Sequence, residues 1–385
     1  MCRHYFANDE QIYKRGNAMI IMDVKVDNLY ALKNFHMNMS YPKKIVDSTV
    51  PGEYLEDRPN FRYKKVNIIM GGNATGKTSL GKLLMLFANY FRDGEYGRFT
   101  RIIEDRKRDA SLSVDFVTCD EILCRFEMHI AAKENEEYGE EDVNIRISGT
   151  EIGKRDNYEI CAARLDRDEG EEFPYDKIKT NGWIFSYPYD ASKSKTYRSI
   201  ESDSRYLHIL EQVLKTLDPS IREVIKVKEL ENTYAIKLNH QSVIIKDGQI
   251  VDTQLLSSGT KAGLDISYII ASLICDMHDL YYCDELFSYV NSDVEKACLS
   301  IIIDKLNGKK QLFFTTHNVD ILDMQLPKHS FTFLKKNVEN KEKPIQCVYV
   351  SDFLKRNTDS LKSAVENDLF CTAPDLDRLY ELIAD

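Results

Sequence analysis

Residues 71–78 carry groups that could bind phosphate. The stretch is rich in glycine and closes on a lysine and a hydroxyl residue, and in order it contains Gly71, Gly72, Asn73, Ala74, Thr75, Gly76, Lys77 and Thr78, followed by Ser79. Glycines let backbone N–H groups curl around a phosphate, and the N-terminus of a following helix adds its positive end. Lys77 would then hold the β- and γ-phosphates of a nucleotide, and Thr78 would ligate Mg²⁺.

The flanking sequence predicts the elements that such a loop needs. Residues 66–70 form a short apolar run typical of a buried parallel strand. After the loop, apolar residues recur at helical spacing, namely Leu83, Leu84, Leu86, Phe87 and Phe91. A strand, a glycine-rich loop and a helix in this order are the context in which a phosphate-binding motif works.

Two later apolar runs end in groups that could complete a nucleotide site. Residues 280–283 are followed by two carboxylates, Asp284 and Glu285, and residues 311–316 are followed by His317. Open α/β sheets bind ligands outside the carboxyl ends of their strands. We therefore expect the two carboxylates to lie beside the phosphate-binding loop.

Five short motifs, taken in order, resemble the nucleotide-binding domain of ABC-type ATPases. They are GGNATGKT, LLSSGTK, YYCDEL, FSYVN and FFTTHN. Among these ATPases the chain is most similar to the branch that contains the SMC, RecF and OLD (overcoming lysogenization defect) proteins, whose loop carries Asn at its third position, as Asn73 does here. The resemblance extends from about Met19 to about Asp323. It implies an α/β P-loop NTPase of ABC type, with a mixed sheet flanked by helices, an antiparallel β subdomain and a helical lobe.

The resemblance implies roles for individual residues in Mg²⁺-dependent ATP hydrolysis. Asp284 matches the carboxylate that helps to hold Mg²⁺ together with Thr78, and Glu285 matches the base that activates the attacking water. His317 matches the residue that contacts the γ-phosphate, and Lys77 would neutralise charge during the reaction. ATP and Mg²⁺ are the expected cofactors.

A further motif implies a second subunit. Ser257, Ser258 and Gly259 match the signature sequence, which in this family faces the nucleotide bound to the opposite subunit. The resemblance therefore implies a homodimer, or a higher homo-oligomer, assembled through the ATP sites. One departure is Asn291, which stands where the family often has Asp after the carboxylates.

Composition limits the remaining classes of function. Of the 385 residues 43% are apolar and 30% are charged, with a net charge of −10. This acidic balance argues against nucleic-acid binding driven by the overall charge, although it does not exclude a local basic groove.

No apolar run approaches the roughly 20 residues of a membrane span. The nine cysteines include no CxxC pair, so we expect reduced thiols in a cytoplasmic protein that does not associate with membranes.

The pattern along the chain predicts three regions. Residues 1–18 form an N-terminal extension, residues 19–325 form the ATPase domain with β and helical insertions over 92–250, and residues 326–385 form a C-terminal helical cap. The irregular segment 41–62 connects two parts of the domain. The aromatic stretch 183–189 fits either a partner surface or packed core.

The missing features narrow the biological role that the resemblance implies. No long coiled coil is predicted, which argues against a chromosome-clamping SMC protein. The 62 residues after Asp323 are few for the TOPRIM nuclease domain of full OLD enzymes. The chain resembles stand-alone OLD-like ATPases, so we expect an ATP-dimerised sensor or regulatory subunit that controls a separate effector in bacterial phage defence or abortive infection. The alternatives are a RecF-type DNA-repair ATPase that clamps DNA and a slow, ATP-bound structural scaffold.

Overall fold

The fold was analysed in a computed structural model of the chain. The structure describes residues 19–46, 48–134, 136–174, 177–178, 180, 182–187, 194–195, 204–230, 233–246, 249–251, 256–354, 356, 359–372 and 380–382. The expected N-terminal extension, residues 1–18, lies outside the described residues. None of the helices in the described part has the length and apolar composition to cross a membrane.

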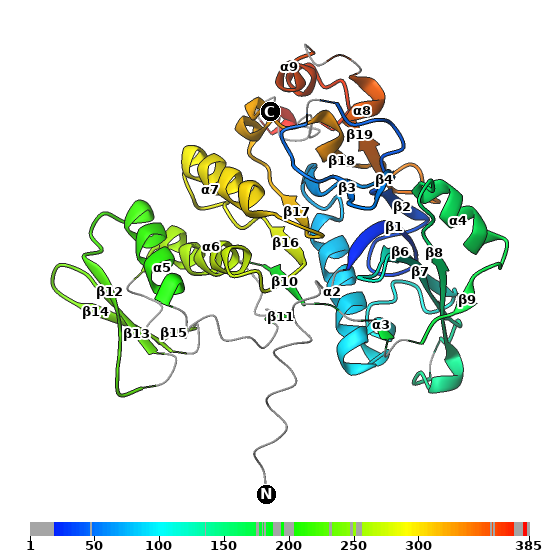
Figure 1. Cartoon of the computed structure of the whole chain (residues 1–385), viewed down its shortest axis with the longest axis horizontal. Helices are drawn as coiled ribbons and strands as arrows, with labels where there is room; N and C mark the ends of the chain where they lie inside the picture. Colours follow the sequence, from blue (N-terminus) through cyan, green and yellow to red (C-terminus); the bar gives the residue numbers. More distant parts are fainter. Residues whose placement is uncertain are drawn as a thin grey trace, which may run out of the picture.

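A seven-stranded mixed sheet forms the centre of the molecule (Figure 1). Its order is β11 (Ser194–Lys195), β10 (Trp183–Ser186), β16 (Leu280–Asp284), β17 (Gln311–Thr315), β5 (Val66–Met70), β18 (Phe331–Lys336) and β19 (Ile345–Tyr349). The five inner strands are parallel to one another, and the two edge strands are antiparallel to their neighbours. The carboxyl ends of β5, β16 and β17 therefore open on the same edge of the sheet.

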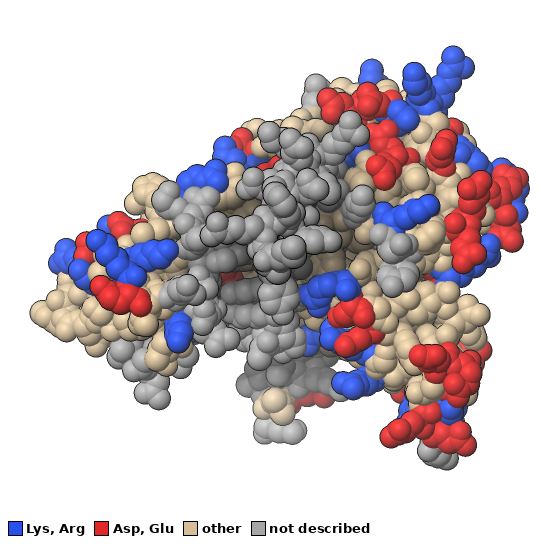
Figure 2. Space-filling view, turned by 60° about the horizontal axis from the view of Figure 1, so that its bottom comes forward, with Lys and Arg blue, Asp and Glu red and all other residues tan. Residues whose placement is uncertain are grey.

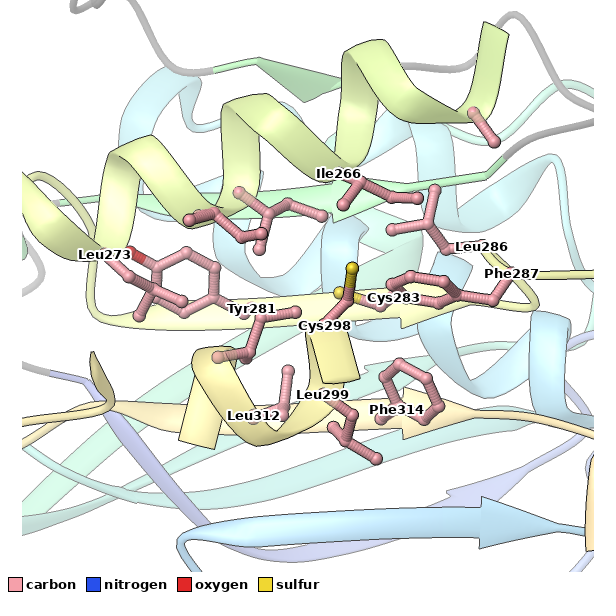
Figure 3. Packing of buried hydrophobic residues seen from close by; sticks show 14 of the residues in the cluster. Ile266, Leu273, Tyr281, Cys283, Leu286, Phe287, Cys298, Leu299, Leu312 and Phe314 are labelled. Atoms are coloured by element: carbon pink, nitrogen blue, oxygen red, sulfur yellow. The ribbon is translucent and has the colours of Figure 1, made fainter. Parts of the chain in front are cut away.

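Helices cover both faces of this sheet. α6 (Ser258–Ile274) and α7 (Ser292–Lys305) pack on one face, and α2 (Lys77–Asp93) packs on the other. Side chains of β16 and β17 alternate between the two faces, as a strand period of two requires. Figure 3 shows the α6–α7 side, where Tyr281 and Cys283 of β16 meet Ile266 of α6 and Leu299 of α7. The strands are largely apolar because both of their faces are buried, and their polar residues, Gln311, Asp284 and Thr315, lie at the strand ends.

A second, six-stranded antiparallel sheet packs over α2. Its order is β2 (Phe35–Asn38), β1 (Ile20–Asp27), β6 (Ala110–Val117), β7 (Ile122–Ile130), β8 (Val143–Glu151) and β9 (Glu171–Glu172). The short elements beside it are α3 (Gly97–Thr100), η1 (Glu140–Asp142) and α4 (Tyr158–Asp166). This is the expected antiparallel subdomain, but it takes β1 and β2 from the sequence that precedes the phosphate-binding loop.

A lobe at one end of the molecule combines helices and strands (Figure 1). In it α5 (Ser204–Leu217) packs along α6, and a four-stranded antiparallel sheet contacts α5. The strands of that sheet are β12 (Glu223–Lys226), β13 (Thr233–Lys237), β14 (Ser242–Lys246) and β15 (Gln249–Ile250). The expected helical lobe is therefore present, with an added small sheet.

Three expectations about the domain need correction. Residues 326–385 are not simply a helical cap, because β18 and β19 complete the central sheet before α8 (Val350–Phe353) and α9 (Leu361–Glu366). Likewise, β10 lies within the predicted insertion 92–250, yet it belongs to the central sheet. Its side chains are buried, so the described part of the aromatic stretch is core. Segment 41–62 contains a hairpin, β3 (Tyr54–Leu55) with β4 (Arg58–Arg62).

Candidate nucleotide site

The predicted phosphate-binding loop joins β5 to α2 and has an unusual backbone. Gly71 has φ 150°, Ala74 has φ 58° and Gly76 has φ 94°. A Cβ on Gly71 would lie 2.4 Å from the carbonyl oxygen of Leu334, on β18. Glycine is therefore required at this position both by the backbone angle and by close packing. The loop thus forms a tight cradle against strand β18.

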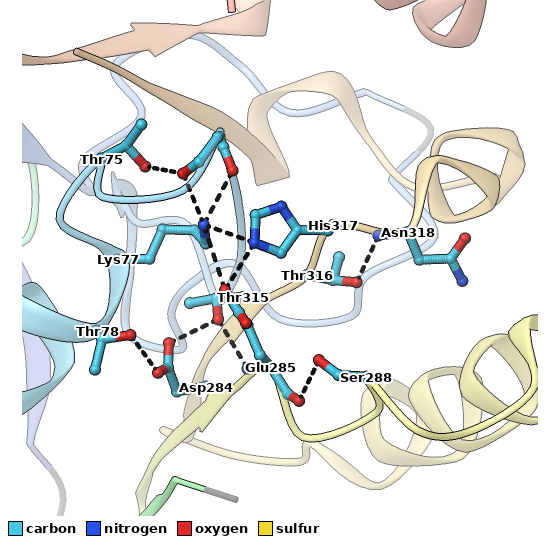
Figure 4. Close-up of polar contacts among 12 residues, drawn as sticks. Thr75, Lys77, Thr78, Asp284, Glu285, Ser288, Thr315, Thr316, His317 and Asn318 are labelled. Carbon is cyan, nitrogen blue, oxygen red and sulfur yellow. Dashed lines mark hydrogen bonds and ion pairs between the residues drawn. The ribbon is translucent and has the colours of Figure 1, made fainter. Parts of the chain in front are cut away.

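Lys77 lies at the centre of the cradle with only 4% of its surface exposed. Its Nζ donates to the carbonyl oxygens of Gly71 at 2.9 Å and Gly72 at 3.2 Å. Nζ also lies 3.4 Å from Oε1 of Glu285 and 3.1 Å from Nε2 of His317 (Figure 4). Burial lowers the pKa of the Lys77 ammonium, although the nearby Glu285 opposes that shift. A second anion at this position would therefore be strongly favoured.

A set of oxygen atoms that suits Mg²⁺ lies next to the cradle. The hydroxyl of Thr78 donates to Oδ2 of Asp284 at 2.6 Å, and Thr315 donates to Oδ1 at 2.8 Å. Asp284 is 5% exposed, and burial raises the pKa of its carboxyl. Hydroxyl and carboxylate oxygens are ligands that Mg²⁺ prefers, and this ion commonly takes one or two protein ligands plus phosphate oxygens. The residues present therefore fit Mg²⁺ bound with a nucleotide.

Glu285 follows the end of β16 in a left-handed backbone conformation, with φ 49°. Its N–H donates to Oγ1 of Thr315 at 2.9 Å, which anchors the turn to β17. The side chain is 25% exposed, and its Oε1 lies 2.8 Å from Nε2 of His317. The hydrogen bond with His317 holds the pKa of the Glu285 carboxyl below its usual range. The carboxylate is therefore ionised, and its position beside the cradle would allow it to accept a hydrogen bond from a water molecule there.

His317 follows β17 and contacts both Lys77 and Glu285 through its Nε2. With its hydrogen on Nε2 the imidazole donates to the Glu285 carboxylate, and with its hydrogen on Nδ1 it accepts from the Lys77 ammonium through Nε2. The structure brings together Lys77, Thr78, Asp284, Glu285 and His317 at one edge of the sheet (Figure 4).

The signature residues lie apart from this cluster. Ser257 caps the N-terminus of α6 by accepting from the N–H of Thr260 at 3.1 Å, and both Ser257 and Ser258 are exposed. A Cβ on Gly259 would lie 2.9 Å from the carbonyl oxygen of Tyr289, so α6 begins against the loop that follows Glu285. Within the described part of the chain, no hydrogen bond or ion pair joins residues 257–259 to the phosphate-binding loop.

Two supporting residues were not singled out by the sequence analysis. Tyr282 is fully buried and donates its hydroxyl to the carbonyl oxygen of Lys77 at 2.7 Å. Its ring also lies where a Cβ on Gly81 would be, so only glycine allows α2 to approach β16 so closely. Thr315 contacts both Asp284 and Glu285. Thr315 belongs to a recognised motif, but nothing in the sequence pattern shows which atoms its hydroxyl or that of Tyr282 contacts.

The topology and the placement of the loop confirm the expected fold class, an α/β P-loop NTPase of ABC type. The phosphate-binding loop follows the inner strand β5, and the two carboxylates lie at the end of β16. The histidine follows β17, the strand between β5 and β16. An antiparallel sheet and a helical lobe lie on either side of the central sheet. These features are those of a mixed sheet whose parallel strands present their carboxyl ends to a ligand.

Comparisons with known proteins found similar solved structures. No protein-family model matches the chain, and no curated protein matches it. The SMC head bound to the C-winged helix domain of ScpA is 12% identical, with 87% of this chain and 100% of that chain covered and a TM-score of 0.49. The Pyrococcus furiosus SMC head with an extended coiled coil, bound to the C-terminal domain of ScpA, is 11% identical over 92% and 100%, with a TM-score of 0.46. The recombination mediator RecF with ATP is 13% identical over 78% and 92%, with a TM-score of 0.37.

Proposed function

We propose that this protein binds ATP with Mg²⁺ and hydrolyses it. One observation carries the proposal: a buried lysine, an oxygen pair suited to Mg²⁺ and a carboxylate–histidine pair converge where β5, β16 and β17 end. Phosphoryl transfer to water depends mainly on positioning and on neutralising charge. These are the functions that the cluster can supply.

Each residue of the site has a separate role in the proposed reaction. Lys77 binds the β- and γ-phosphates, and its ammonium exchanges the Glu285 carboxylate for phosphate oxygens when the nucleotide enters. Thr78 and Asp284 would hold Mg²⁺, which would supply positive charge against the phosphates. Glu285, released from Lys77, orients the attacking water and takes its proton. His317 keeps its Nε2 hydrogen directed at Glu285 or at the γ-phosphate.

We further propose that the competent state is a head-to-tail homodimer or a higher homo-oligomer. Ser257 and Ser258 are exposed at the start of a 17-residue helix, and they do not contact the phosphate-binding loop of their own chain. A helix N-terminus with small polar residues can bind phosphate. The signature of one subunit would therefore complete the nucleotide site of its partner.

The role proposed for this ATPase is control of a separate effector protein in phage defence, with ATP closing the dimer and hydrolysis reopening it. Its support is the ordered set of motifs that resembles stand-alone OLD-like ATPases. On the face drawn in Figure 2, Lys and Arg side chains lie intermixed with Asp and Glu over the described residues. On that face charges of both signs are mixed, whereas a DNA clamp would need a run of basic groups.

The test measures ATP turnover and solution mass together. Turnover should require Mg²⁺ and should be unchanged by duplex DNA. In light scattering, the solution mass of the Glu285→Gln variant should double when Mg-ATP is added. Stimulation of ATP turnover by duplex DNA would contradict the effector role and support a DNA clamp. ATP-dependent assembly without turnover would instead support the structural scaffold, and absence of ATP binding would refute the site.

A further inference from the structure

Glu295 is a buried carboxylate close to the site that no step of the proposed reaction uses. It lies in the first turn of α7 and is 3% exposed. Among the described residues it forms no ion pair, and burial raises the pKa of its carboxyl. A buried carboxylate without a cation destabilises a fold. Packing alone therefore gives no reason for an acidic residue at this position.

Both carboxylate oxygens of Glu295 accept hydrogen bonds from the two neighbours of His317. The hydroxyl of Thr316 donates to Oε1 at 2.8 Å, and Nδ2 of Asn318 donates to Oε2 at 2.7 Å. Thr316 Oγ1 also accepts from the N–H of Asn318 at 3.0 Å. Glu295, Thr316 and Asn318 thereby form a closed ring of hydrogen bonds around the segment that carries His317.

His317 itself depends on this support. Its side chain is 41% exposed, so little packing holds the imidazole. The residues on each side of it are held by the hydrogen bonds of Thr316 and Asn318 with Glu295. α7 begins directly after the loop that leads away from Glu285. The side chain of Asn291 caps the helix by accepting a hydrogen bond from the N–H of Asp293 at 2.8 Å. Glu295 thus ties the segment that carries the histidine to the segment that follows the base.

We propose that Glu295 is a positioning residue that fixes the imidazole of His317 against Glu285 and the γ-phosphate. The inference rests on the ATPase activity proposed above. A glutamine at this position keeps one acceptor and presents an NH₂ group in place of the other oxygen. Facing Asn318, this group meets another donor and that side of the ring opens; facing Thr316, it reverses the hydrogen bond of the hydroxyl, so the ring rearranges in either case. A displacement of about 1 Å at a reacting group can lower a rate by about 100-fold.

The experiment compares Glu295→Gln with wild type in steady-state ATP turnover. We expect kcat to fall about 10- to 100-fold, while KM for ATP changes by less than about 3-fold, because Lys77 and the loop still bind the phosphates. Asp293→Asn is the matched control, since it removes a carboxylate from the same helical turn, and that side chain is 86% exposed. The control should retain wild-type turnover.

A double-mutant cycle identifies the route of the effect. In a His317→Ala background, Glu295→Gln should cause no further loss of kcat, because the group that it positions is absent. Equal losses in both backgrounds, or an unchanged kcat in Glu295→Gln, would overturn the proposal. Thr316→Val, which removes one donor to Glu295, provides a second variant should Glu295→Gln fail to fold. Absence of turnover in the wild type would instead refute the ATPase assignment.

Discussion

Replacing Glu285 by glutamine should separate nucleotide binding from hydrolysis. The amide keeps an oxygen in the place of Oε1, which lies 2.8 Å from Nε2 of His317. The geometry of the loop and the histidine should therefore be retained. The change removes the negative charge that lies 3.4 Å from Nζ of Lys77 and removes the only group proposed to accept a proton from water.

Two magnitudes follow from these contacts. Loss of a general base typically lowers kcat by about 10²- to 10⁴-fold. Binding should change in the opposite direction, because Lys77 no longer has to leave a carboxylate to reach the phosphates. The Glu285 side chain is 25% exposed, so its ion pair contributes at most about 1 kcal/mol. ATP should therefore bind up to about five-fold more tightly.

The assay combines single-turnover hydrolysis with calorimetric titration of ATP in the presence of Mg²⁺. Glu140→Gln is the control, since Glu140 is exposed on η1 beside the antiparallel sheet. It should leave both quantities unchanged. Normal hydrolysis by Glu285→Gln would show that another group activates water. Weaker ATP binding would show that the Lys77–Glu285 contact does not compete with the nucleotide.

Three other changes test the remaining parts of the site. Lys77→Ala should weaken ATP binding at least about 10-fold in titrations, because a hydrogen bond to a charged group contributes about 1.5–3 kcal/mol. Asp284→Asn should raise the melting temperature of the nucleotide-free protein at neutral pH and abolish the further stabilisation by Mg-ATP. Burial raises the pKa of the Asp284 carboxyl above its unfolded value, so the free energy of unfolding falls as pH rises from the unfolded pKa through the folded pKa. Gly71→Ala should lower the free energy of unfolding by about 1–3 kcal/mol in denaturant titrations, because its Cβ would lie 2.4 Å from Leu334 O.

Each of these changes has a matched comparison. Lys341→Ala removes an exposed lysine and should keep ATP affinity; unchanged affinity in Lys77→Ala as well would refute the phosphate site. For the metal site, a nucleotide-free Asp284→Asn protein that melts below wild type would contradict the burial argument. Gly72→Ala should change the free energy of unfolding by less than about 0.5 kcal/mol, because no atom lies within 4 Å of its Cβ. Equal effects of the two glycine substitutions would mean that the contact with Leu334 does not matter.

Much of the site could be predicted because its chemistry depends on residue types in a fixed order. A glycine-rich loop between an apolar strand and an amphipathic helix is a local pattern, and the same is true of a strand that ends in two carboxylates. Parallel strands place such ends at one edge of a sheet, so the predicted meeting of Lys77, Asp284 and Glu285 needed no knowledge of the distances. Those distances are now seen to be within hydrogen-bonding or ion-pairing range.

The predicted domain boundaries were less accurate, because sheet membership depends on contacts between distant segments. β18 and β19 lie beyond the end predicted for the ATPase domain, yet β18 pairs with β5 and closes the cradle at Gly71. β10 falls inside a predicted insertion and pairs with β16. A short apolar run looks the same whether it joins a central sheet or packs elsewhere. Only the paired backbone distinguishes the two cases.

The sequence by itself therefore determined which groups are proposed to do the chemistry, because the motifs are local and follow one another in a fixed order. The tertiary structure decided how those groups are supported. Tyr282 reaches the carbonyl oxygen of Lys77 from strand β16, and Glu295 reaches both neighbours of His317 from α7. These contacts span segments separated by 205 and by 21 or 23 residues, and no sequence period encodes them. They exist because close packing of helices on the sheet brings particular side chains within hydrogen-bonding distance.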